Sequence, residues 1–146
     1  MTTGFSATAQ YLETSEYGIR RSNMATVTQS RRSDLESLHD AWQECAKPNW
    51  DGDGAIAVEH VCYNYAYGII EQLPRSVKSP FITGEPDGHM SLEWHYSASM
   101  NVSVSVSPDG IVYWASLIGT DKQCGSFSVI ADLPMALLVS LSKVSV

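Results

Sequence analysis

The chain has 146 residues, with 9 Lys and Arg against 16 Asp and Glu, which gives a formal net charge of −7. Its hydrophobic fraction of 44% and charged fraction of 17% are typical of one globular domain, and they exclude a largely disordered chain and a coiled coil. Because a phosphate footprint needs clustered Lys and Arg, we expect no direct nucleic-acid binding.

The sequence carries no long apolar run, and we expect no secretory leader. No segment approaches the ~20 apolar residues that span a bilayer, so we expect no membrane binding. The N-terminal residues lack the basic-then-apolar layout of a signal peptide, and we expect a cytoplasmic protein. The three cysteines fall in no metal-ligand spacing, so we expect reduced thiols, no bound metal and no cofactor.

Residues 1–32 are rich in Ser, Thr and small side chains and show no sustained apolar period. We expect a flexible N-terminal arm there, and one domain over residues 33–146. Ser33 and Glu36 fit the S-x-x-E capping box, and apolar residues then recur at helical spacing. A first helix is therefore expected from about Asp34 to Ala46.

A second apolar stretch extends from Ala55 to Leu73, and Pro74 is expected to end it. Its apolar residues lie at helical spacing on one stripe, which consists of Val58, Val61, Cys62, Tyr65, Ile69 and Leu73. We expect this helix to pack centrally on a sheet.

The apolar period changes to two after this helix, which indicates strands. Half-buried strands are expected over residues 90–96, 101–107 and 111–118, with a weaker fourth over 126–130 and a short helix beginning at Asp132. The sequence therefore predicts an α+β fold. It consists of two N-terminal helices, a three- to four-stranded antiparallel meander and a short C-terminal helix, with the helices on one sheet face.

The negative charge is concentrated in one region of the chain. Residues 1–33 carry four Arg and two Glu, a balance of +2, so the remaining residues carry −9. Seven carboxylates and one cation, Lys47, lie between positions 34 and 59. The carboxylates are Asp34, Glu36, Asp40, Glu44, Asp51, Asp53 and Glu59. They predict one strongly negative end of the fold, which either keeps the protein soluble or binds a basic partner.

Four short motifs occur in a defined order along the chain. They are the loop Asn49-Trp50-Asp51-Gly52-Asp53-Gly54-Ala55, the pair Leu73-Pro74, the segment Leu92-Glu93-Trp94 and the turn Asp109-Gly110. In these motifs, residues 33–113 resemble a group of small bacterial and prophage proteins that share an N-W-D-G-x-G-A loop, an L-P helix stop, an L-E-W strand and a D-G turn. The resemblance implies a mobile-element context and supplies no catalytic residues.

The loop after the first helix has part of a calcium-binding pattern. Asn49, Asp51 and Asp53 match positions 1, 3 and 5 of an EF-hand loop. Position 12 is His60 in place of the bidentate Glu, so a hard cation would lose its strongest ligand. This favours the interpretation that Asp51 and Asp53 cap the second helix and that Trp50 fills the core.

An alternative function is metal-dependent hydrolysis or nuclease activity through Asp87, Glu93 and His95. Asp87 after a proline, followed by Glu93 and His95 in an E-x-H spacing, is similar to the P-D…E-x-K arrangement of metal-dependent nucleases. However, His95 replaces the Lys that would orient the attacking water, and no basic groove is evident for a substrate. The sequence therefore favours binding without catalysis.

The main hypothesis is a non-enzymatic acidic binding protein. Its most concrete form is a phage or mobile-element inhibitor of a host nucleic-acid-handling defence complex, of the anti-CRISPR type, that docks on a basic protein surface. The residues expected to contact this partner are Asp40, Glu44, Trp50, Asp51, Asp53 and Glu59. A toxin–antitoxin or immunity partner protein is the alternative binding function.

Overall fold

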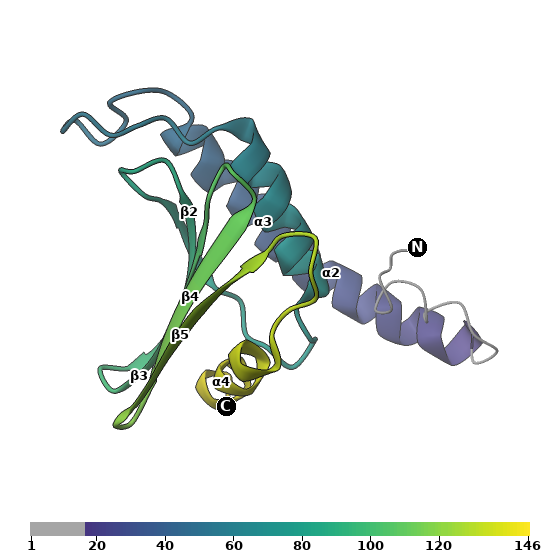
Figure 1. Ribbon diagram of the computed structural model, residues 1–146. Helices are drawn as coiled ribbons and strands as arrows, with labels where there is room; N and C mark the ends of the chain where they lie inside the picture. Colours follow the sequence, from purple (N-terminus) through teal and green to yellow (C-terminus); the bar gives the residue numbers. More distant parts are fainter. Residues whose placement is uncertain (1–16) are drawn as a thin grey trace.

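The computed structural model describes the backbone of residues 17–146 and the side chains of residues 31–146. This part of the chain forms three helices and a five-stranded sheet (Figure 1). The elements are α2 (Tyr17–Cys45), α3 (His60–Gln72), β1 (Phe81–Gly84), β2 (Met90–Ser97), β3 (Met100–Val106), β4 (Ile111–Ile118), β5 (Asp121–Ser128) and α4 (Met135–Val144). The α+β prediction is confirmed, with two helices before the strands and one after them.

The sheet is an antiparallel meander in the order β1-β2-β3-β4-β5, so every strand pairs with its neighbours along the chain. It has five strands instead of the expected three or four. β1 was not predicted, because four residues are too few to show a period of two. β5 begins at Asp121, before the expected start at residue 126, because pairing with β4 defines it and its own apolar pattern is weak.

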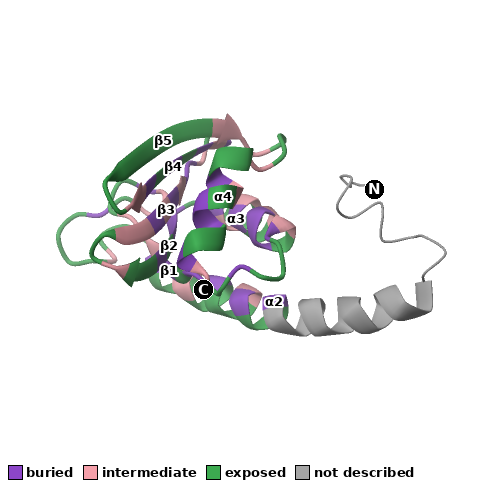
Figure 2. Cartoon of the chain, turned by 90° about the horizontal axis from the view of Figure 1, so that it is seen from below, coloured by how far each residue is buried: buried purple, intermediate pink, exposed green. Residues whose placement is uncertain are grey.

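All three helices cover the same face of the sheet (Figure 1, Figure 2). α3 contacts β2 and β3, α4 contacts β2, β3 and β4, and α2 packs against α3 and β1. Leu92, Val104 and Trp114 form a buried cross-strand row. The side chains that alternate with them on β2 and β3, such as Glu93 and Ser103, are polar and lie on the opposite face. The sheet therefore has one buried and one open face.

The first helix is much longer than expected, because α2 begins at Tyr17 and not at Asp34. Residues 17–32, which the sequence assigns to the arm, are therefore helical. Residues 1–16 of the expected arm lie outside the described residues. The expected boundary between arm and domain thus falls inside a continuous helix.

Arg31 explains why the helix continues on the N-terminal side of the predicted start. Its side chain is buried, and Nη1 donates to Oδ2 of Asp34 at 2.7 Å. Nη2 donates to the carbonyl oxygens of Pro74 and Val77, both at 2.8 Å. These contacts hold a helical turn against the α3–β1 connection. Ser33 therefore lies inside α2 and does not cap it, since tertiary contacts override a local capping preference.

α3 is shorter than expected, because residues 55–59 are extended. The amides of Ile56 and Val58 donate to the backbone carbonyls of Pro86 and Cys45, both at 2.8 Å. These bonds to other segments replace the helical bonds that the apolar pattern predicts. The buried residues of α3 are Cys62, Ala66, Ile69 and Ile70, so the predicted stripe is confirmed in part.

α4 completes the helical layer near the C-terminus. It begins at Met135, with Pro134 at the N-cap position, and not at Asp132 as expected. Leu137 and Leu141 are buried, whereas Met135 is exposed. Among the residues that the structure describes, no helix is long and apolar enough to cross a membrane.

Candidate functional site

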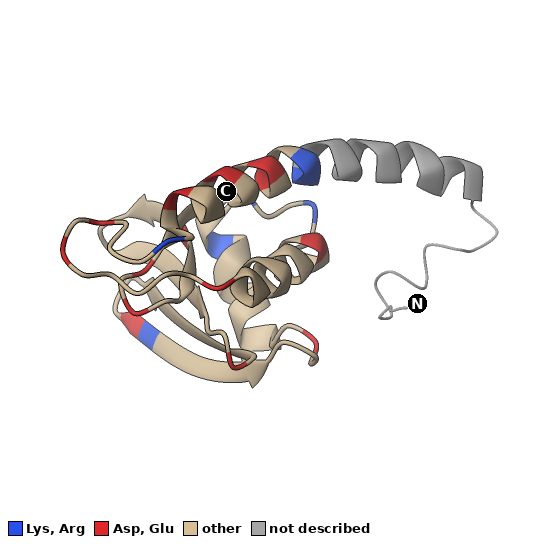
Figure 3. Cartoon of the chain, turned by 90° about the horizontal axis from the view of Figure 1, so that it is seen from above, with Lys and Arg blue, Asp and Glu red and all other residues tan. Residues whose placement is uncertain are grey.

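Acidic residues recur along α2, as the red segments of this helix in Figure 3 show. Glu36, Asp40 and Glu44 are spaced four residues apart, so they form a stripe on one side of the helix, and all three are exposed. Like charges at this spacing destabilise a helix, and a cationic partner relieves that repulsion. Asp34, the fourth carboxylate of this segment, does not belong to the stripe because it is buried beside Arg31.

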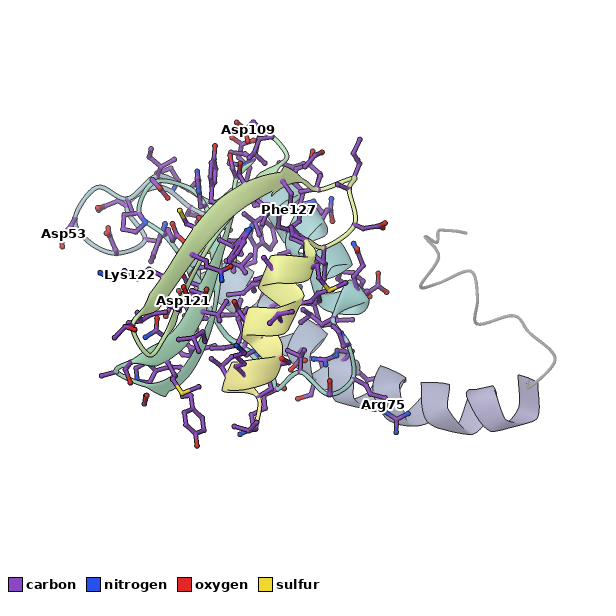
Figure 4. The ribbon with its side chains drawn as sticks, turned by 60° about the horizontal axis from the view of Figure 1, so that its bottom comes forward. Asp53, Arg75, Asp109, Asp121, Lys122 and Phe127 are labelled. Carbon is purple, nitrogen blue, oxygen red and sulfur yellow. The ribbon has the colours of Figure 1, made fainter. Side chains whose placement is uncertain are left out.

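The loop after α2 is closed by its own polar side chains. Oδ1 of Asn49, a residue with φ of 61°, accepts the N–H of Gly54 at 2.7 Å. Oδ1 of Asp51 accepts the amides of Asp53 at 2.8 Å and Ala55 at 3.0 Å. Asp53 itself is exposed and lies at the outer tip of the loop (Figure 4). The side-chain oxygens of Asn49 and Asp51 therefore accept hydrogen bonds from amides of their own loop.

Glu59 occupies the N-cap position of α3. Because α3 begins at His60, the prediction that Asp51 and Asp53 cap this helix is wrong. The Glu59 carboxylate is exposed and makes no capping hydrogen bond. The amide just before Glu59 donates to the carbonyl of Cys45 at 2.8 Å. This bond brings Glu59 beside the C-terminal end of α2.

Trp50 fixes the loop to the extended segment before α3. Its indole N–H donates to the carbonyl of Ile56 at 3.0 Å, and the half-buried ring packs against the core. All six residues predicted to bind a partner therefore lie on the C-terminal half of α2, on the loop that follows it or at the N-cap of α3. The exposed carboxylates there are called the acidic face below, and they are Glu36, Asp40, Glu44, Asp51, Asp53 and Glu59.

An aromatic cluster of α2 and α3 side chains adjoins the acidic face. The ring centroid of Tyr63 lies 5.4 Å from His60, 5.6 Å from Trp42, 5.9 Å from His39 and 6.1 Å from Tyr67. The sequence did not predict this cluster, because its members come from two helices. The signal that could have revealed it is the spacing of three and four residues between the aromatic positions of each helix.

An open groove of about 450 Å³ lies between α2 and α3, beside the aromatic cluster. Its lining residues are Arg32, Leu35, Glu36, His39, Asp40, Tyr63, Tyr67 and Glu71. Carboxylates outnumber the single Arg, and the tyrosines add aromatic rings. Both kinds of group attract cationic side chains. The groove is therefore chemically suited to an Arg or Lys of a partner.

The turn between β1 and β2 gathers a second set of polar side chains, Glu85, Asp87 and His89, whose ligand-type atoms lie within 4.8 Å of one another. Sequence reasoning combined Asp87 with Glu93 and His95 instead. Those two residues lie farther along β2, with exposed side chains. Burial raises the pKa of the Glu85 carboxyl above its ordinary value, and a hydrogen bond from a serine opposes the shift.

No protein-family model, curated protein or solved structure matches this chain. The features of the chain that bear on its function are the charge, the aromatic rings and the groove of the α2–α3 surface.

Proposed function

We propose that this chain is a non-enzymatic binding protein whose acidic face docks on a basic surface of a protein partner. The observation that carries the proposal is the set of six exposed carboxylates on the C-terminal half of α2, the following loop and the N-cap of α3, with Arg32 and Lys47 as the exposed cations nearby in the sequence. The negative potential of these carboxylates attracts a basic partner and orients it as it approaches. In physiological salt this attraction extends about one Debye length, ~8 Å, from the surface.

The aromatic cluster supplies binding affinity that the charges alone do not. Rim charges mainly raise the association rate, whereas aromatic side chains packed at the centre of an interface contribute most of the affinity. Tyr67 is 37% exposed, and Tyr63 lies beside it in the groove. A cationic side chain of the partner that enters the groove contacts these rings and the carboxylates of Glu36 and Asp40 together.

The partner that we propose belongs to a host nucleic-acid-handling defence complex, which makes the chain a mobile-element inhibitor of the anti-CRISPR type. Proteins that bind nucleic acid present clustered Lys and Arg. The acidic face is complementary to such a surface and would compete with nucleic acid for it. The resemblance of residues 33–113 to prophage proteins supports the same context.

Two triple variants with equal charge change test the role of the acidic face. Asp40→Asn/Glu44→Gln/Asp53→Asn removes three carboxylates from it, and Glu93→Gln/Asp121→Asn/Asp132→Asn removes three exposed carboxylates elsewhere. Each triple changes the formal net charge from −7 to −4. In the first step, the full-length chain is used as bait to capture partners from lysates of bacteria with active defence complexes. The identified partner is then titrated in purified form, and its nucleic-acid binding is measured with and without the chain.

We expect the acidic-face triple to weaken partner binding about tenfold or more and the control triple to change it less than about twofold. Raising the salt from about 50 mM to about 300 mM should weaken wild-type binding strongly. Equal affinities of the two triples, or binding that salt leaves unchanged, would contradict the proposal. A partner whose nucleic-acid binding is unaffected would contradict the inhibitor role.

A further inference from the structure

We infer that the β1–β2 turn is a binding site for a divalent transition-metal ion such as Zn²⁺, held by Glu85, Asp87 and His89. Each residue offers one ligand atom, and the three atoms lie within 4.8 Å of one another. Two carboxylate oxygens and one imidazole nitrogen suit Zn²⁺ and leave a coordination position for water. No residue of the acidic face belongs to this set, so the inference does not depend on the proposed function.

The backbone of the turn holds the three ligands in place. The amide of Glu85 donates to the carbonyl of His89 at 2.8 Å, and the amide of Gly88 donates to the carbonyl of Glu85 at 2.9 Å. Gly88 has φ of +94°, and a Cβ atom there would lie 3.2 Å from Ile56 Cγ2. The turn is thus a tightly defined loop packed on a neighbouring segment, which is the rigid support that a metal site requires.

Ser105 and Tyr113 orient the His89 and Glu85 side chains. The His89 ring stacks on Tyr113, with centroids 6.1 Å apart and an interplanar angle of 10°. Nδ1 of His89 lies 2.9 Å from Oγ of Ser105, and this hydroxyl donates its one proton to Oε1 of Glu85 at 3.2 Å. The Nδ1–H group of His89 therefore donates to Ser105, which leaves Nε2 as the ring nitrogen that binds the ion. Metal-binding histidines and carboxylates commonly have such outer partners, which fix their orientation. One serine hydroxyl therefore positions two of the three ligands.

The charge of the turn also favours a cation. Among residues 31–146, the ion pairs include no Lys or Arg partner for Glu85 or Asp87. Asp87 lies beside the His89 ring, with Oδ2 4.0 Å from Nδ1, and its side chain is 61% exposed. Because Zn²⁺ ligands lie ~2.0–2.2 Å from the ion, two of them can be up to ~4.4 Å apart. A small rotation of the exposed Asp87 side chain completes the coordination.

Calorimetric titration of the tag-free, chelator-treated, full-length chain with Zn²⁺ tests this site, with Mg²⁺ and Ca²⁺ titrated in parallel. We expect one saturable Zn²⁺ site that is weakened about tenfold or more in His89→Ala and in Asp87→Asn. His95→Ala removes the exposed imidazole of β2, and Cys124→Ser removes the exposed thiol. Both control variants should bind Zn²⁺ as the wild type does.

Absence of saturable Zn²⁺ binding would overturn the inference, and so would equal affinities of His89→Ala and the wild type. Loss of binding in Cys124→Ser would assign the ion to a thiolate and overturn it as well. Mg²⁺ or Ca²⁺ binding that is as tight as Zn²⁺ binding and survives His89→Ala would exclude a transition-metal site. Because Asp87 is exposed, Asp87→Asn gives a decisive result even if His89→Ala does not fold.

Discussion

The guanidinium of Arg31 donates from Nη1 to Oδ2 of Asp34 at 2.7 Å, and the two side chains are only 5% and 3% exposed. Nη2 continues to the carbonyls of Pro74 and Val77, which lie 43 and 46 residues farther along the chain. A single charged side chain thus fastens α2 to the α3–β1 connection.

Replacing Arg31 with Ala should lower the free energy of unfolding by about 3–5 kcal/mol, because it leaves the buried Asp34 charge and the carbonyls of Pro74 and Val77 without their donor. Urea denaturation followed by tryptophan fluorescence measures the loss. Arg32→Ala is the matched control, since Arg32 is exposed, and it should change stability by no more than about 0.5 kcal/mol. Equal losses in the two variants would show that the buried pair does not stabilise α2.

Two glycine substitutions should shift stability in opposite directions. A Cβ atom on Gly84 would lie 2.6 Å from Cβ and Sγ of Cys45, so Gly84→Ala should destabilise the fold by about 1–3 kcal/mol. A Cβ atom on Gly68, inside α3, has no neighbour within 4 Å, so Gly68→Ala should stabilise it by about 0.5–1 kcal/mol. Thermal denaturation measures both effects. A Tm for Gly84→Ala at or above that of Gly68→Ala would be inconsistent with this α2–β1 packing.

The two loop aspartates should differ in their effect on folding. Asp51→Ala removes the acceptor of two loop amides and should cost about 1 kcal/mol, whereas Asp51→Asn retains an acceptor oxygen and should cost less. Asp53→Ala should change stability by less than about 0.5 kcal/mol, because Asp53 is exposed at the loop tip. Chemical denaturation distinguishes the three variants. A larger loss in Asp53→Ala than in Asp51→Ala would contradict this assignment of the loop contacts.

One of the three cysteines should react rapidly in the native protein. Cys124 is exposed, whereas Cys45 and Cys62 are buried. Burial raises the pKa of Cys62 to about 11, so at neutral pH its thiol is protonated and unreactive until the pH approaches that value. Titration with a thiol reagent near pH 7 should show one fast-reacting group in the native chain and three after unfolding. Cys124→Ser should abolish the fast reaction, and a remaining fast phase would contradict the burial of the other two.

The periodic parts of the fold could be predicted from the sequence, because their own side chains define them. Val102, Val104 and Val106 alternate with polar residues, and β3 follows this pattern. β1 and the extended residues 55–59 could not be predicted in this way. Their conformation depends on bonds to β2, to Pro86 and to the end of α2, which no local pattern encodes.

The acidic stripe of α2 was predictable, since a spacing of four residues places carboxylates on one side of a helix. The burial of Asp34 was not, because the carbonyls that hold its partner Arg31 lie more than forty residues away. The Glu85, Asp87 and His89 set was missed, although alternate polar residues around a P-D-G turn are a usable signal. The ring of Tyr113 and the hydroxyl of Ser105, which orient these side chains, come from other strands and cannot be inferred from the local pattern.

The strand order has a consequence for how the chain folds. Each strand pairs only with its neighbours along the chain, so the sheet can form by closing a series of short hairpins. The Arg31 bridge, in contrast, closes loops of 43 and 46 residues. Because the entropy cost of closing a loop rises with its length, we expect the hairpins to form before α2 docks. The first of the described helices along the chain would then reach its final position after the sheet that it packs against.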